Sequence, residues 1–128
     1  MVDGSDYDAF IPFYPVHDLA ATRDFYVREL GLVLEREEAG CLIVRAAGGH
    51  LGFCLFEGPL PEHDGLTLAL VASDVDGVYR RLRRLGAETE LPPRRDEQHR
   101  VQRFYARDPD GYRVEIRRFL APLDSRPT

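Results

Sequence analysis

The chain has 128 residues, of which 44% are hydrophobic and 30% charged, and its formal net charge is −5 at pH 7, values that fit one ordinary globular domain. No apolar run approaches the roughly 20 residues that a membrane-spanning helix needs. The acidic N-terminus lacks the basic-then-apolar pattern of a signal peptide. We therefore expect a cytoplasmic protein without a membrane partner.

The basic residues are unevenly distributed and of one kind. All 17 are arginines, and 13 of them follow residue 79. The absence of lysine excludes a lysine Schiff base and a P-loop. Nucleic acid is not an expected partner, because the net charge is acidic and no motif interleaves aromatic with basic residues. Cys41 and Cys54 lie in apolar strand patterns without a CxxC motif, so we expect buried, reduced thiols.

The first half of the chain begins with an acidic leader, residues 1–9, which we expect to be loose. A strand over residues 10–16 contains two prolines, which favours a position at a sheet edge. Asp18 is a typical N-cap for a helix that ends at Gly31. Three further strands are predicted over residues 32–35, 41–46 and 51–56.

The second half repeats this plan after a linker rich in proline and glycine, residues 57–65. A strand is predicted over residues 66–72, and Asp74 then caps an amphipathic helix that ends at Gly86. A short strand near residues 88–91 and a polar loop over residues 92–99 follow. We therefore predict one domain over residues 10–119, with one module over 10–56, a second over 66–119 and a loose tail over 120–128.

The second module ends in a predicted hairpin. Pro109, Asp110 and Gly111 are typical turn residues between two apolar strands. Glu115 lies between Val114 and Ile116 in the last strand. Because strand side chains alternate between faces, Glu115 points away from those two apolar neighbours, toward either solvent or a cavity.

Several of these stretches together resemble the vicinal oxygen chelate superfamily, which includes glyoxalase I, bleomycin-resistance proteins, fosfomycin-resistance enzymes and extradiol dioxygenases. The motifs are Val16-His17-Asp18-Leu19, Asp24-Phe25-Tyr26, Leu30-Gly31-Leu32, Asp74-Val75-Asp76 and Asp108-Pro109-Asp110-Gly111 with Glu115. The resemblance covers nearly the whole chain. It implies an α+β fold of two βαβββ modules, each with a sheet curled into a cup, and a homodimer.

Metal-using members of this superfamily hold a divalent ion with His or Glu side chains on the first and last strand of each module. The matching positions in this chain are Ile11, Phe53, Thr67 and Glu115. Only Glu115 is a competent ligand, and one carboxylate does not hold a catalytic divalent metal. We therefore predict neither a metal nor another cofactor, although an unforeseen histidine that completes a site stays an alternative.

A cup without metal ligands is predicted to form an apolar pocket for a small molecule. Resemblance to fosfomycin-resistance enzymes implies that Tyr105 faces this cup, and Arg103 or Arg117 is the expected partner of Glu115. The expected lining consists of Ile11, Phe13, Phe53, Leu55, Thr67, Arg103, Tyr105, Glu115 and Arg117. In an alternative interpretation the aromatic residues are plain core and Glu115 is part of a structural ion pair.

Two functions follow from this pocket. In the first, the protein is a metal-free binding module that captures a small aromatic or cationic compound, in the manner of bleomycin-resistance proteins. In the second, it is an enzyme of the lyase, isomerase or resistance-transferase kind. Glu115 would then act as a general base, with Tyr105 and Arg103 polarising a carbonyl group, or would bind a metal. The sequence leaves open whether any reaction is catalysed.

Overall fold

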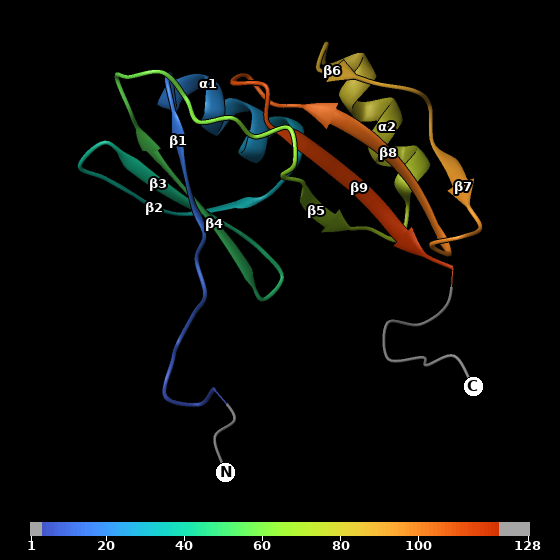
Figure 1. Cartoon of the computed structure of the whole chain (residues 1–128), viewed down its shortest axis with the longest axis horizontal. Coiled ribbons are helices and arrows are strands. Elements are labelled where there is room, and N and C mark those ends of the chain that lie inside the picture. The colour runs from blue at the N-terminus through green and yellow to red at the C-terminus, as the bar shows by residue number, and fades with distance from the viewer. Residues whose placement is uncertain (1–3, 121–128) are drawn as a thin grey trace. The chain divides into compact units, whose positions relative to one another are not determined.

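Two mixed sheets, each covered on one face by a helix, make up the computed structural model, which describes residues 4–120 (Figure 1). The chain divides into two compact units between Pro61 and Glu62, within the predicted linker. This is the α+β architecture with two curled mixed sheets that the sequence predicts. Parts of the predicted leader, residues 1–3, and of the predicted tail, residues 121–128, lie outside the described residues. No helix within residues 4–120 is long and apolar enough to cross a membrane.

The first unit contains a four-stranded sheet in the order β1-β4-β3-β2. The edge strand β1 runs parallel to β4, and the other neighbours are antiparallel. Its elements are β1 (Phe13–Val16), α1 (Leu19–Arg23), the π-helical turn η1 (Asp24–Glu29), β2 (Val33–Glu38), β3 (Cys41–Ala46) and β4 (Gly49–Leu55).

The helical segment of this unit differs from the single α-helix that the sequence predicts. Asp18 is the N-cap, as predicted, and its Oδ1 accepts a hydrogen bond from Ala21 N at 3.1 Å. After five α-helical residues the chain widens into η1, where Leu30 N donates to Phe25 O, five residues back, at 2.9 Å. Phe25 is buried, and its ring meets Tyr26 edge-on at 5.0 Å between centroids.

Phe53 corrects one expectation about the pocket. Its ring is completely buried and lies 4.5 Å from the ring of Tyr26, so it belongs to the hydrophobic core on the helix side of the sheet. Phe13 pairs with Gly52 across β1 and β4, and Tyr14 pairs with Phe53. Because side chains alternate along a strand, Phe13 points to the opposite face from Phe53. Phe53 is therefore a core residue and not part of a pocket wall.

The second unit contains a sheet in the order β5-β9-β8-β6, with β7 also paired to β8. The edge strand β5 runs parallel to β9, and the other pairs are antiparallel. Its elements are β5 (Leu68–Val71), α2 (Val75–Arg84), β6 (Glu88–Thr89), β7 (Arg94–Asp96), β8 (Val101–Arg107) and β9 (Arg113–Phe119).

The core of this unit forms where α2 packs on the sheet. Asp74 caps α2, with Oδ1 accepting from Gly77 N at 3.0 Å, and Leu82 of α2 is completely buried. Phe104 and Ile116 are buried partners across β8 and β9. Each such side chain removed from water contributes roughly 1.5–3 kcal/mol to stability. Hydrophobic burial therefore fixes which face of β8 and β9 points away from α2.

The strand β7 lies in the segment for which the sequence predicts a polar loop. Its residues Arg94 to Asp96 contain no apolar side chain, and Pro92 and Pro93 precede them, a pattern typical of a loop. The strand exists because Arg94, Arg95 and Asp96 pair with the residues of β8 from Arg103 back to Val101. This tertiary pairing, and not local propensity, decides the structure.

The two cysteines are joined in a disulfide between β3 and β4, so the prediction of reduced thiols is wrong for this structure. Cys41 and Cys54 are direct partners across the strands, with Cα atoms 4.1 Å apart. Leu55 N donates to Gly40 O beside them, which makes this a non-hydrogen-bonded pair, the closer of the two antiparallel pairings. Both residues are half-buried instead of fully buried.

We predict that the double variant Cys41→Ala/Cys54→Ala is less stable than the oxidised wild type by about 3 kcal/mol, the value expected for a cross-link that closes a loop of this length. Chemical denaturation measures the difference. Dithiothreitol should lower the stability of the wild type and leave that of the double variant unchanged. Alkylation of two thiols per chain in native, oxidant-exposed protein without reductant would contradict the disulfide.

Candidate functional site

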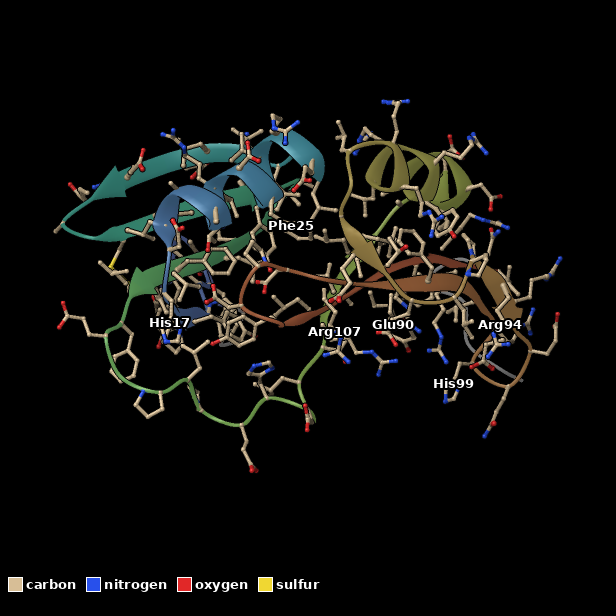
Figure 2. All side chains as sticks on the ribbon, turned by 90° about the horizontal axis from the view of Figure 1, so that it is seen from above. His17, Phe25, Glu90, Arg94, His99 and Arg107 are labelled. Carbon is tan, nitrogen blue, oxygen red and sulfur yellow. A yellow bond between two sulfur atoms is a disulfide. The ribbon has the colours of Figure 1, made fainter. Side chains whose placement is uncertain are left out.

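The face of the second sheet that points away from α2 is covered by charged side chains. Across β8 and β9, Arg103 pairs with Arg117, Tyr105 with Glu115, and Arg107 with Arg113. These residues alternate with the buried apolar residues that contact α2, so they share the opposite face. Figure 2 shows the labelled side chains of Glu90, Arg94 and Arg107 on this side of the sheet, away from α2. We call this surface the arginine face.

Glu115 is the buried acid of the arginine face, with only 4% of its surface exposed. Its Oε2 accepts a hydrogen bond from Arg103 Nη1 at 3.2 Å, and its Oε1 lies 3.6 Å from Arg117 Nη1. A carboxylate removed from water stays charged only when it is paired, and two guanidinium groups meet that requirement. Glu115 is thus the counter-ion of both neighbouring arginines.

Arg103 also pairs with a second acid, which lies on β7. Its Nη2 donates to Asp96 Oδ2 on β7 at 2.6 Å. Asp96 also accepts from the backbone N of His99 at 3.0 Å and contacts His99 Nδ1 at 2.8 Å. These hydrogen bonds from His99, followed by the charge of Arg103, lower the pKa of Asp96 from 3.8 to about 2. Asp96 therefore stays ionised and holds Arg103 from the side opposite Glu115.

Tyr105 is the aromatic residue of the arginine face. The guanidinium carbon of Arg113 lies 3.5 Å from the centre of its ring, and that of Arg103 lies 5.5 Å away. Glu90 Oε2 in turn lies 3.3 Å from Arg113 Nε and 3.6 Å from Arg107 Nε. Cation–π contacts of this kind favour one position of the ring. The phenol is therefore held in place before any ligand arrives.

A pocket of about 460 Å³ opens on this face, between the segment that holds β7 and the strand β8. This volume is within the range of small-molecule sites. Leu91, Pro92 and Tyr105 contribute apolar surface to its wall, and the other lining side chains are mostly charged. The charged lining residues are Glu90, Arg94, Arg95, Asp96, Glu97, Arg103 and Arg113.

The residues predicted to line one pocket lie in two separate units. Arg103, Tyr105, Glu115 and Arg117 come together on the arginine face. Thr67 is exposed and precedes β5 in the same unit.

The remaining predicted residues belong to the first unit. Phe13 borders a hollow of about 340 Å³ with Ile43 and the disulfide. Ile11 is half-buried before β1, and Leu55 is half-exposed at the end of β4.

The side chains at the superfamily's ligand positions do not fit a divalent metal. Phe53 is buried in the core, Ile11 carries no ligand atom, and Glu115 is occupied by two guanidinium groups. Within residues 4–120, no three His, Cys, Asp or Glu side chains gather in an arrangement for a metal ion.

The histidines have contacts elsewhere. His17 Nε2 lies 2.9 Å from Gly58 O, His50 contacts Glu35, His63 stacks on Tyr112, and His99 contacts Asp96. His99 is the one that approaches the arginine face, through Asp96 and Arg103. Its role there is to hold Asp96 in position.

Of the residues that line the pocket, the sequence predicted only Arg103 and Tyr105, and it missed the charged residues Glu90, Arg94, Asp96 and Arg113 among others. The alternation of charged side chains in Arg113, Glu115 and Arg117 was a signal for a charged face that includes Arg113. No comparable signal marks Arg94 and Asp96, because the pairing of β7 with β8 brings them to this face.

Comparison with known proteins places this geometry in a family. The model of the Glyoxalase/Bleomycin resistance protein/Dioxygenase superfamily matches residues 6–116. None of the curated proteins matches the sequence.

Solved structures share the fold at low sequence identity. A glyoxalase/bleomycin resistance protein/dioxygenase from Nocardioides is 22% identical, with a TM-score of 0.73 over 95% of this chain and 87% of its own. TioX from Micromonospora sp. ML1 is 18% identical, with a TM-score of 0.75 over 88% of this chain and 98% of its own. A glyoxalase/bleomycin resistance protein/dioxygenase from Alicyclobacillus acidocaldarius is 21% identical, with a TM-score of 0.69 over 89% of this chain and 92% of its own.

At such identities the neighbours support the fold alone, whereas the family model covers most of the chain. By the match to that model over residues 6–116, this chain belongs to the glyoxalase/bleomycin resistance protein/dioxygenase superfamily.

Proposed function

We propose that this protein binds a small aromatic molecule in the pocket of the arginine face, without a bound metal, in the manner of bleomycin-resistance proteins. The observation that carries the proposal is the pocket of about 460 Å³, which Leu91, Pro92 and Tyr105 line together with seven charged side chains. The volume of the pocket is within the range of small-molecule sites, and its charged side chains can fix the orientation of a ligand that also contacts the apolar residues.

The rigidity of the wall supports a binding role. Tyr105 is held by Arg113 and Arg103, and Arg103 is held by Asp96 and Glu115. Side chains that are already fixed lose little conformational entropy when a ligand binds. The same contacts that neutralise the arginines therefore also prepare the pocket.

The partners of Glu115 favour binding over catalysis. A general base must accept a proton in the transition state, but Glu115 is the counter-ion of Arg103 and Arg117. The enzymatic alternative draws its support from the position of Tyr105 directly opposite Glu115. Turnover that is lost in Glu115→Gln while binding is retained would establish it.

The proposal includes a homodimer, as the superfamily implies. Phe13 on β1 and Val71 on β5, two strands at sheet edges, are 52% and 64% exposed, and a second copy that covers them removes apolar surface from water. The cytoplasmic location stays a prediction from the sequence. The disulfide weighs against it, because reducing compartments keep most such pairs as thiols.

Asp96 makes the stability of the folded state depend on pH. Its pKa is lower in the folded protein, about 2, than its ordinary value of 3.8. Its contribution to stability is therefore complete above pH ~4 and is lost as the pH falls toward ~2. We predict that Asp96→Asn lowers the melting temperature at pH 6 and that the difference from the wild type shrinks steadily between pH ~4 and ~2. An unchanging difference across that interval would contradict this role.

Tyr105 is the residue whose removal tests the binding site. We predict that some members of a panel of aromatic metabolites and antibiotics raise the melting temperature in proportion to the logarithm of their concentration. In Tyr105→Ala, affinity for those compounds should fall by about tenfold, since an aromatic contact of this size is lost.

Tyr7→Ala is the matched control, because Tyr7 is 76% exposed and lies outside the pocket. It should bind like the wild type. Elemental analysis of protein purified without chelator completes the test, and a stoichiometric divalent metal would remove the metal-free binding role.

A further inference from the structure

The arginines that line the pocket outnumber its acids by one. The pocket is lined by four arginines, Arg94, Arg95, Arg103 and Arg113, and by three acids, Glu90, Asp96 and Glu97. Each acid has an arginine partner: Glu90 pairs with Arg113, Asp96 with Arg103, and Glu97 with Arg95. Among residues 4–120, no ion pair, hydrogen bond or ring contact reaches the guanidinium group of Arg94.

Strand register explains why Arg94 lacks a partner. Arg94 on β7 lies directly opposite Arg103 on β8, and Arg103 lies directly opposite Arg117 on β9. Three arginines thus form one row across the arginine face. Like charges in direct opposition repel one another unless acids lie between them. Glu115 and Asp96 serve Arg103, and Glu115 also serves Arg117, which leaves the charge of Arg94 uncompensated.

We infer that this pocket selects an aromatic carboxylate, with the carboxylate on Arg94 and the ring beside Leu91, Pro92 and Tyr105. This ligand class is inferred for the same pocket as the proposed binding function and rests on that function. The planar guanidinium group pairs with a carboxylate through two parallel hydrogen bonds. The ligand thus supplies the acid that the row lacks, and its ring covers the apolar wall.

The pairing of the acids with arginines disfavours a cationic ligand. The sequence left such a ligand open because of Glu115. That acid is buried and already serves two arginines. A cation in the pocket would therefore meet the unpaired charge of Arg94, while the three acids that line the pocket already pair with arginines. Repulsion of this kind discriminates between ligands as effectively as a new attractive contact.

The test compares ligands that differ only in charge. Benzoate and indole-3-acetate are the carboxylate probes, benzamide and indole-3-acetamide are their neutral counterparts, and benzylamine is the cation. Affinities are measured by calorimetry and thermal shift at up to ~10 mM ligand, which reaches millimolar dissociation constants. We expect each carboxylate to bind at least about tenfold more tightly than its amide, the usual effect of a charge-assisted hydrogen bond, and benzylamine to bind least. Added salt should reduce this preference.

Two variants assign the preference to a residue. Arg94→Gln should lower the affinity for each acid to the level of its amide and so abolish the difference between them. Arg84→Gln removes the same charge from α2, which packs on the other face of the sheet, and should keep the full preference. Both positions are exposed, so neither substitution disturbs the core.

The outcomes separate the two proposals. Equal affinity of the wild type for acids and amides, or tighter binding of benzylamine, would overturn the carboxylate inference and leave the binding function standing. A preference for acids that survives in Arg94→Gln would overturn the role of Arg94. If none of the probes binds, both the inference and the proposed binding function fail.

Discussion

The arrangement of charged side chains in the second unit depends on a buried carboxylate that lies between two guanidinium groups. Glu115 is removed from water on the last strand of the sheet, and Arg103 and Arg117 lie within ion-pair distance of it. The apolar faces of β8 and β9 are committed to α2, so the charged residues that alternate with them must share the other face. Without a buried acid, that face would place arginines opposite one another with nothing between them. The ion pairs of Glu115 thus allow these arginines to lie opposite one another in the sheet.

With these two arginine partners, the side chain of Glu115 forms ion pairs where a metal ligand would be expected. The resemblance to metal-using members predicts a ligand at this position, but here its oxygens face arginines, and the side chains of Ile11 and Phe53 carry no ligand atom. Guanidinium groups bind carboxylates and stack on aromatic rings. Tyr105 and Arg113 are an example of such stacking within the chain itself.

Much of the fold follows from the sequence because its signals are local. The N-caps Asp18 and Asp74, the bounds of β3 and the internal repeat are all readable from residue types and spacing. The sequence also predicts Arg103 or Arg117 as the partner of Glu115, since a buried acid requires a cation nearby, and in the structure both lie within ion-pair distance. In contrast, β7, the disulfide and the core position of Phe53 depend on which strands meet and in which register. Register is a tertiary property, so alternation along one strand cannot reveal it.

The central claim is that Glu115 acts as a counter-ion of arginines and not as a metal ligand. Calorimetric titration of Zn²⁺, Ni²⁺ and Mn²⁺ into the wild type and into Glu115→Gln tests it most directly. The account predicts that no ion binds in a 1:1 complex that depends on Glu115, so the two proteins give the same titration. A 1:1 complex in the wild type that disappears in Glu115→Gln would contradict the account and favour a metal-dependent enzyme.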